Sequence, residues 1–463
     1  MRSSTVKEAQ NRIINAINKH DLISFDIFDT LLVRPYNNPG DLFVHLEKIH
    51  QMNGFAAARC NAEWQARKKT KREEITYDEI YDRIDAPFEC MYEREIELEK
   101  LTLRANPDMQ KYFQYAVEQK KKVIIISDMY LPKYVIEDVL ISNNYYGYDK
   151  IYLSSDCFFT KHTGNLFLFA LNDMGIHGQD VLHIGDNYYS DLLMAKKNGI
   201  HACHYTKIKN QLFHDMKNAK RYRVKNAKSL GASIILGTLA LWNIKHPRPA
   251  GIDTGRPDYF EDFGYVYGGP VVLAYMEWLK NKLKNDGITD VLFVARDGYI
   301  LKEVFDLMTG NSFNTLYIYA PRIVSMLFLM DCDNDDFFES IGLSGIKKIL
   351  CFYKNKDPLL RSATPPLDGL SFCAAKEFFQ KNIALYKQLA QAEKDVYYKY
   401  AVSGMLGKKN CRCKKNCGSK KIAVIDSITA KCSAQKLLQE LSARDEIGVQ
   451  GYYWSVLRMG GGG

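Results

Sequence analysis

The sequence predicts an α/β protein that begins with a doubly wound parallel sheet carrying a helical insertion and continues into a second α/β domain. Three observations support this. Short continuous apolar runs recur through the first 210 residues, helical patterns separate them, and the same alternation returns after residue 260. Continuous apolar runs indicate strands covered on both faces. Strands separated by helices indicate βαβ units.

Four apolar runs are expected to form the first sheet. They are LISFDIF (22–28), KVIIIS (122–127), KIYLSS (150–155) and DVLHIG (180–185). Between the first two runs, roughly over 34–118, the chain is rich in Glu, Lys and Arg and its apolar residues have helical spacing. This stretch is too long for one crossover helix. We therefore expect an inserted helical cap in a first domain that spans 1–210.

The stretch 211–260 is basic and then rich in Pro and Gly, so we expect a linker region there. A second α/β domain of unknown function is expected over 261–463, with strand, turn and helix patterns at 290–308 and 420–441 and a last strand at 449–457. The segment CRCKKNC (411–417) lacks the paired spacing of a zinc site and is interpreted as a basic loop. The terminal GGGG is expected to be flexible.

The overall composition is that of a globular protein: 463 residues, 46% hydrophobic and 25% charged. The net charge of +9 suits anionic substrates or an anionic membrane surface, but it is too small and too dispersed for a nucleic-acid footprint. No apolar run is long enough for a transmembrane helix. The eleven cysteines, without an export signal, favour a cytoplasmic location with reduced thiols.

Polar side chains follow each of the four predicted strands, where ligands bind in open α/β sheets. These residues are Asp26, Ser127, Asp128, Lys161, Asp186 and Asp191. A carboxylate can act as nucleophile in phosphoryl transfer, further carboxylates can hold Mg²⁺, and a hydroxyl and an ammonium can bind phosphoryl oxygens. Each residue alone could be a helix cap, a turn former or a surface lysine. The ordered combination favours a phosphate site.

The motifs DIFDT, SDMY, KHTGNLF and HIGDNYYSDLLMAKKNGI resemble, in order and spacing, the four motifs of the haloacid dehalogenase (HAD) superfamily over roughly residues 20–206. The insertion after the first motif is similar to a C1-type cap. The resemblance implies Mg²⁺ as cofactor and Asp26 as nucleophile. It also implies metal ligation by Asp26, the Phe28 carbonyl and Asp186, with Asp191 as a further ligand or as support for the metal site. It implies support from Thr30 and phosphoryl binding by Ser127 and Lys161. Asp128 and Asn187, at the same strand ends, are counted as candidate substrate-binding residues.

One position departs from the family pattern. Phosphatases of this superfamily usually carry an acid two residues after the nucleophile, where this chain has Phe28, and Asp29 stands one position later. Three explanations stay open: the leaving group needs no proton, another group such as Asp29 or a residue of the cap supplies it, or the domain is slow or inactive and serves binding. Dehalogenases also lack that acid, but the intact GDNYYSD segment favours Mg²⁺ and phosphate chemistry.

Together with the long C-terminal extension, FDIFDTLL and SDMYLP resemble predicted HAD hydrolases of bacterial lipopolysaccharide and capsule biosynthesis. This resemblance implies a phosphohydrolase or phosphotransferase acting on a sugar-, polyol- or glycan-linked phosphate. It also allows peripheral association with a membrane glycan-assembly complex. The alternative is a catalytically weak HAD-like domain fused to a C-terminal transferase or glycan-binding domain.

In the second half, Arg296 and Asp297 follow one predicted strand and Asp426 ends another. Both places suit a ligand site, and we count Arg296 and Asp297 as candidate substrate-binding residues. Arg322 could join an anion site there. The alternative is that these are turn residues with a buried Arg–Asp pair.

Overall fold

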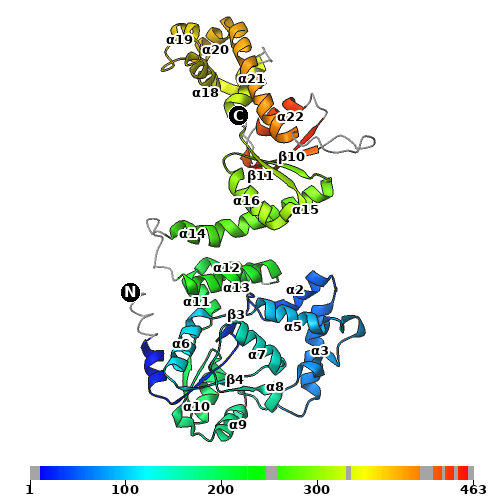
Figure 1. Cartoon of the computed structure of the whole chain (residues 1–463), viewed down its shortest axis with the longest axis vertical. Coiled ribbons are helices and arrows are strands. Elements are labelled where there is room, and N and C mark those ends of the chain that lie inside the picture. The colour runs from blue at the N-terminus through cyan, green and yellow to red at the C-terminus, as the bar shows by residue number, and fades with distance from the viewer. Residues whose placement is uncertain are drawn as a thin grey trace. The chain divides into compact units, whose positions relative to one another are not determined.

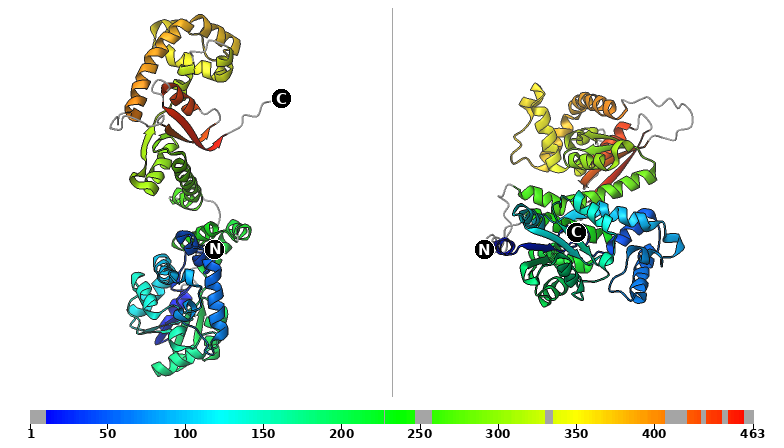
Figure 2. Two further views of the ribbon diagram at one scale, coloured as in Figure 1. Left: turned by 90° about the vertical axis from the view of Figure 1, so that its right-hand side faces the viewer. Right: turned by 60° about the horizontal axis from the view of Figure 1, so that its bottom comes forward.

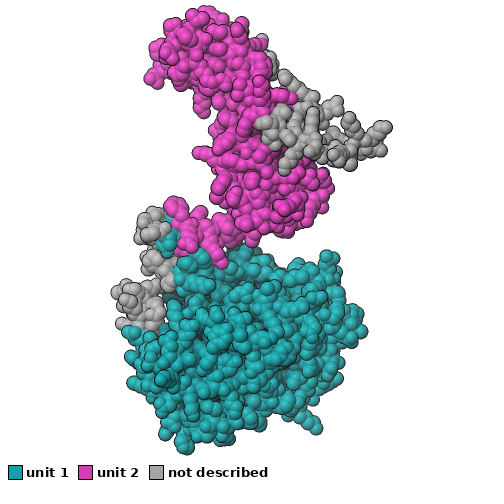
Figure 3. Space-filling view, viewed as in Figure 1, with its two compact units in different colours: residues 1–259 teal, residues 260–463 magenta. Residues whose placement is uncertain are grey.

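The computed structural model describes residues 11–226, 228–246, 258–329, 335–406, 421–429, 433–442 and 447–456, and its elements are labelled in Figure 1. The chain divides into two compact units, Met1–Tyr259 and Phe260–Gly463 (Figure 3). Each unit is built around a parallel sheet, so the predicted succession of two α/β domains is confirmed. The segment 411–417 and the terminal GGGG lie outside the described residues.

The first sheet has five parallel strands in the order β5-β4-β1-β6-β7. Their bounds are β1 (Leu22–Phe25), β4 (Lys122–Ser127), β5 (Lys150–Leu153), β6 (Val181–Gly185) and β7 (His201–His204). Because β1 is central, the residue that follows it lies in the middle of the carboxyl edge. The sequence predicted four of these strands but not β7, whose residues HACH are partly exposed and do not form an apolar run.

Alternate residues of the strands face two helical layers, as expected for a sheet covered on both sides. On one face, Ile23 and Phe25 share a core with α6 (Pro107–Glu118) and α7 (Lys133–Ser142). On the other face, Leu22 and its neighbours on β4 share a core with other helices. These are α9 (Asn165–Met174) and α10 (Ala195–Lys197).

The helical insertion lies between β1 and β4, to one side of the first sheet (Figure 1). It contains α2 (Asp41–His50), α3 (Phe55–Lys69), α4 (Tyr77–Tyr81), η1 (Ala86–Phe88) and α5 (Met91–Thr102). The antiparallel strands β2 (Leu32–Val33) and β3 (Arg104–Ala105) close it. The expected cap of 34–118 therefore extends one helix too far, because α6 packs on the sheet, with the Phe113 ring 5.5 Å from Phe25. Apolar spacing alone does not reveal which surface an amphipathic helix covers.

The predicted linker 211–260 also needs correction. The chain forms α11 (Ile208–Asp215), α12 (Lys217–Lys225) and α13 (Leu230–Lys245), and Leu236 and Ala240 of α13 join the first core. Gly237 lets α13 cross the backbone closely, since a Cβ there would lie 2.3 Å from the Pro35 carbonyl carbon. The basic character of this stretch comes from the exposed faces of these helices. The Pro/Gly-rich part, 247–257, and residue 227 lie outside the described residues.

The second sheet has four parallel strands in the order β11-β10-β8-β9, and β10 and β11 lie side by side in Figure 2. Their bounds are β8 (Asp290–Val294), β9 (Asn314–Ile318), β10 (Lys421–Thr429) and β11 (Gly448–Val456). One face packs on α15 (Gly269–Asp286) and α16 (Gly298–Thr309). The other packs on α22 (Ser433–Ser442) and the second half of α21 (Ile383–Leu406).

A separate helical core lies beside this sheet within the second unit. It joins the first half of α21 to further helices. These are α17 (Arg322–Leu329), α18 (Asp335–Lys354), α19 (Pro358–Ala363) and α20 (Phe372–Lys381). Further short elements among the described residues are α8 (Ser154–Cys157), α14 (Tyr259–Phe263), η2 (Gly178–Asp180), η3 (Tyr188–Met194), η4 (Gly264–Gly268) and η5 (Gly310–Ser312), and residues 11–18 are also helical. None of the described helices combines the length and apolar character needed to cross a bilayer.

Candidate active site at the carboxyl edge of the first sheet

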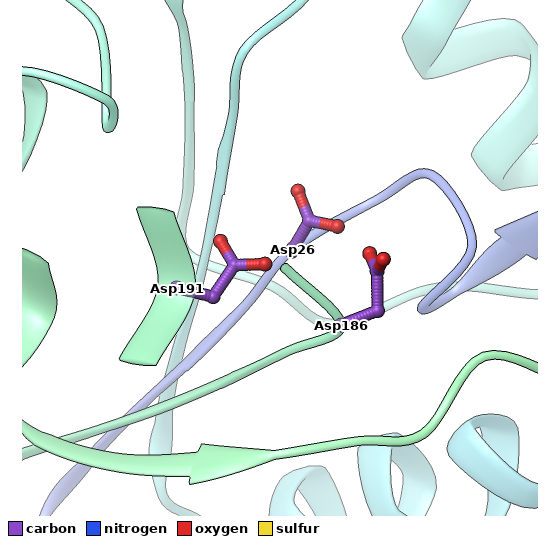
Figure 4. A group of neighbouring side chains, drawn as sticks. All are labelled: Asp26, Asp186 and Asp191. Carbon is purple, nitrogen blue, oxygen red and sulfur yellow. The ribbon is translucent and has the colours of Figure 1, made fainter. Parts of the chain in front are cut away.

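Three carboxylates from different parts of the first unit converge at this edge (Figure 4). Asp26 follows β1, Asp186 follows the neighbouring strand β6, and Asp191 lies on η3. All three are buried, and each offers an oxygen such that these oxygens all lie within 4.8 Å of one another. The carboxyl ends of adjacent parallel strands meet at one edge, so this clustering follows from the order of the strands.

The three carboxylates fit a divalent cation. Asp186 Oδ2 is buried and accepts no well-directed hydrogen bond from any described residue, although Lys207 Nζ lies 2.7 Å away. Burial and the nearby Asp26 raise the pKa of Asp186 to about 7. Burial and a neighbouring carboxylate both disfavour the charged form of Asp186, and a bound cation would favour it. Clustered carboxylate oxygens are the ligands that Mg²⁺ prefers.

Lys161 supplies the main positive charge beside the nucleophile candidate. Its side chain is buried, and Nζ donates to Asp26 Oδ1 at 2.5 Å and to Asp191 Oδ1 at 2.6 Å. Burial alone would lower the pKa of Lys161, but Asp191 and Asp26 outweigh it and raise that pKa, so the ammonium stays charged. Ser127 Oγ donates to the same Asp26 oxygen at 3.1 Å. The alternative of a surface lysine is therefore wrong.

Further groups hold Asp186 and Asp191, the two acidic residues of the fourth motif, in place. Thr30 Oγ1 donates to Asp186 Oδ1 at 3.2 Å, and the Asn187 amide donates to Asp191 Oδ2 at 2.8 Å. Burial would raise the pKa of Asp191, but Lys161 and the buried His183 lower it. A side chain at Gly185 would overlap Asp191, since a Cβ would lie 2.3 Å from the Asp191 Cγ. Glycine is needed at this close approach.

Asp128 and Asn187 lie at the site, but protein groups occupy their side chains. The Asp128 carboxylate accepts the backbone N–H groups of Lys161 at 2.7 Å and His162 at 3.3 Å. Asn187 Oδ1 caps η3 by accepting the N–H groups of Tyr189 and Ser190. Both residues shape the loops around the site in this structure, and their contact with substrate stays a prediction.

Position 28 faces the insertion, and Asp29 turns toward two lysines. The Arg34 guanidinium lies 4.4 Å from the centre of the Phe28 ring and pairs with Glu99. Lys207 lies 3.2 Å and Lys209 3.5 Å from the Asp29 carboxylate. Burial would raise the pKa of Asp29, but the two lysines outweigh it and lower that pKa. Asp29 is therefore ionised at neutral pH and has no proton to donate. Metal ligation by the Phe28 carbonyl stays a prediction.

Several residues of the site were not expected from the sequence. Lys207 reaches Asp186 because β7 runs beside β6 and ends at the same edge. The missed strand therefore explains the missed lysine. His183 lies inside β6, where Nε2 is 3.2 Å from Asp191 Oδ1 and Nδ1 is 2.8 Å from Ser24 Oγ. A histidine within an apolar run gives no sign that it contacts a buried acid.

The candidate residues of the second half lie in the second unit. Arg296 and Asp297 follow β8, and Asp297 accepts a hydrogen bond from Ser427 Oγ at 2.5 Å. Burial and then Asp297 raise the pKa of Asp426, which Arg322 partly offsets. Asp426 therefore lies near Asp297 and Arg322, but within β10 and not at its end, where we expected it from the sequence. Binding of substrate by Arg296 and Asp297 stays a prediction.

The raised pKa of Asp186 predicts that the metal-free protein loses stability as pH rises from about 4 to about 7. In this window the folded protein keeps a proton that the unfolded chain has released, so a rising pH favours unfolding. The measurement is urea unfolding with EDTA across this window, for the wild type and Asp186→Asn. The decline should be smaller in the variant, and saturating Mg²⁺ should reduce it in the wild type. Equal declines without metal in the two proteins would contradict this.

Comparisons with known proteins give matches to part of the chain. Residues 20–199 match the family model described as haloacid dehalogenase-like hydrolase, which is a family of hydrolases. The matched segment is less than half of the chain, so the chain resembles this family over residues 20–199 only. The comparison with curated proteins gives no match.

Several solved structures are similar to part of this chain. The HAD hydrolase YfnB from Bacillus subtilis, bound to magnesium, is 14% identical, with 42% of this chain and 98% of that chain covered and a TM-score of 0.32. A HAD family enzyme from Bacteroides thetaiotaomicron, in complex with magnesium and inorganic phosphate, is 16% identical, with 41% and 95% covered and a TM-score of 0.32. An L-2-haloacid dehalogenase is 15% identical, with 41% and 85% covered and a TM-score of 0.32.

Proposed function

We propose that the first unit is a Mg²⁺-dependent phosphohydrolase or phosphotransferase that acts through an aspartyl-phosphate on Asp26. The observation that carries this proposal is the convergence on Asp26. Ser127 and Lys161 donate to its Oδ1, and Asp186 and Asp191 lie at metal-binding distance from it. Anion-binding donors and a divalent-cation site on either side of one carboxylate suit a phosphoryl group.

The reaction divides into two steps. An Asp26 oxygen forms a bond to phosphorus while the bond from phosphorus to the leaving oxygen breaks, and water or an acceptor hydroxyl then takes the phosphoryl group from Asp26. Ser127 and Lys161 bind the phosphoryl oxygens, and Thr30 holds Asp186 in place. A bound Mg²⁺, held by Asp26, Asp186, Asp191 and the Phe28 carbonyl, would offset the charge of the phosphoryl group.

The surroundings of position 28 bear on the leaving group. Neither Phe28 nor the ionised Asp29 can give it a proton. This supports a substrate whose leaving group needs no proton, such as an acyl phosphate or a pyrophosphate, or a slow reaction with simple esters. The narrower sequence resemblance suggests sugar-, polyol- or glycan-linked phosphates of surface polysaccharide synthesis in the cytoplasm. The alternative is a weak domain that serves the second unit, which would then be a transferase or a glycan-binding domain.

The test is phosphate release from a panel of acyl phosphates, terminal pyrophosphates and sugar and polyol phosphates, with Mg²⁺ and with EDTA. We expect release that depends on Mg²⁺ and is faster for acyl phosphates or pyrophosphates than for alkyl esters. Release that continues unchanged in EDTA would contradict the proposal. Absence of release from every substrate would favour the alternative of a weak domain.

Phe28→Asp is expected to raise the hydrolysis of alkyl phosphates about tenfold relative to acyl phosphates. A positioned general acid is worth about 10²–10⁴-fold, but the neighbouring Arg34 would lower the pKa of the new carboxyl and reduce the gain. The measurement is the ratio of kcat/KM for the two substrate types. Phe28→Asn, which removes the ring without adding an acid, is the control. Equal ratios in Phe28→Asp and Phe28→Asn would show that leaving-group protonation does not limit the reaction.

A further inference from the structure

Two adjacent acids of the insertion, Glu73 and Glu74, bind loops of the sheet domain. They lie in the segment between α3 and α4. Glu73 Oε2 accepts the Thr160 N–H at 2.8 Å and the Thr163 hydroxyl at 2.6 Å, and Glu73 Oε1 accepts the Asn165 side-chain amide. The Thr160 hydroxyl also donates to Oε2 at 3.3 Å, so one half-buried carboxylate binds three residues of a single loop, 160–165.

Glu74 fixes a second loop. Its Oε2 accepts the Ser154 hydroxyl at 3.0 Å, and Ser154 Oγ accepts the Met129 N–H at 2.8 Å. Arg67 of α3 pairs with Glu74 Oε1 at 2.7 Å. Glu74 is buried, so its loss would leave buried partners unpaired and would disturb the packing. Glu74 therefore stabilises the packing of the fold, and we do not assign it a separate positioning role.

The two loops are those that carry the phosphate-binding groups. Thr160 directly precedes Lys161, and Met129 lies two residues after Ser127. The backbone of Lys161 is held from one side by Asp128 and, through Thr160, from the other side by Glu73. A cleft of about 510 Å³ runs along this junction, lined by Arg67, Glu73 and Glu74 of the insertion and by Asp128, Met129, Tyr130, Thr160, His162 and Thr163 of the sheet domain.

We propose that Glu73 is a positioning residue that fastens the insertion to the loop 160–165 and thereby holds Lys161 against Asp26 and Asp191. The proposal rests on the proposed function. Lys161 Nζ must lie within hydrogen-bond distance of two carboxylates at once, so a small shift of its loop breaks one contact. A misplacement of about 1 Å can cost about 10²-fold in rate. Movement of the insertion away from the sheet would release Glu73 and disorder this arrangement.

The test compares Glu73→Ala, Glu73→Gln and the control Glu97→Ala. Glu97 is an exposed acid of α5 that pairs only with Arg94 among the contacts described for it. Amide hydrogen exchange is measured for residues 160–163 in the full-length protein, together with kcat and KM. We expect Glu73→Ala to speed exchange at Thr160, Lys161 and His162 at least tenfold and to lower kcat about tenfold or more. Glu73→Gln, which keeps an acceptor oxygen, should recover most of both losses, and Glu97→Ala should match the wild type.

Two results would overturn the proposal. One is faster exchange at Thr160 alone, with Lys161 and His162 still protected, because the contact would then be local. The other is a Glu73→Gln variant no better than Glu73→Ala. If the wild type releases no phosphate, the proposed function fails, but the exchange of the Lys161 and His162 amides still decides whether Glu73 positions the loop.

Discussion

Asp26→Asn is expected to lower Mg²⁺-dependent phosphate release by about 10⁴-fold or more, the size of effect seen when a covalent nucleophile is removed. The amide keeps the shape of the side chain and can still accept from Ser127 and Lys161 through its carbonyl oxygen. It loses the charge and the nucleophilic oxygen. The measurement is kcat on the best substrate of the panel, with Mg²⁺ in excess.

The matched control for this variant is Asp21→Asn. Asp21 is exposed and precedes β1 at the opposite end of the strand from Asp26, so its change should leave kcat within twofold of the wild type. An Asp26→Asn variant that keeps a tenth or more of the activity would mean that another residue accepts the phosphoryl group.

Lys161→Met is expected to lower kcat by about 10²–10³-fold, because it removes a positioned donor for the charge of the transferred group. It also leaves Asp26 and Asp191 without their shared ammonium, and breaking a buried ion pair costs about 3–5 kcal/mol of stability. Saturating Mg²⁺ should recover part of the stability, since the cation takes over charge neutralisation, but it should not restore the rate. The measurements are kcat and the urea midpoint with and without Mg²⁺.

Lys150→Met is the control for the lysine. Lys150 is half-exposed and pairs with Asp173 at the amino end of β5, away from the site. Exposed pairs contribute about 0–1 kcal/mol, so neither rate nor urea midpoint should change appreciably. A Lys161→Met variant with wild-type kcat would show that Lys161 only stabilises the fold.

Much of the first unit could be predicted from the sequence because its central strands are apolar runs. β1, β4, β5 and β6 were predicted on this basis, and their order along the carboxyl edge brings Asp26 and Asp186 together. β7 was missed because an edge strand that is partly exposed needs no apolar run. The boundaries of the insertion and of the supposed linker were wrong for a related reason. The apolar patterns of α6 and α13 show that each helix buries one face. They do not show which surface that face packs against.

For the candidate site, too, the sequence predicted which residues take part but not the contacts between them. The motifs identified Asp26, Ser127, Lys161 and the acids of the fourth motif. They could not show that Lys161 contacts two carboxylates, that Asp29 is neutralised by Lys207 and Lys209, or that Glu73 reaches the Lys161 loop. These contacts join segments far apart in the chain, and each depends on where a loop ends. In the second unit β8, β10 and β11 were predicted, but β9 was not, and Asp426 lies within β10 rather than at its end. The helical core between β9 and β10 was not separated from the sheet.

The most direct measurement of the central claim is the binding of beryllium fluoride, which mimics a phosphoryl group on a carboxylate, to the wild-type protein and to Asp26→Asn. We predict ¹⁹F resonances of a bound trifluoride that require both Mg²⁺ and Asp26, and a crystal structure with beryllium bonded to an Asp26 oxygen and with Ser127 and Lys161 donating to fluorine. A trifluoride that binds equally well to Asp26→Asn, or that bonds to another residue, would contradict the assignment of Asp26 as the phosphoryl acceptor.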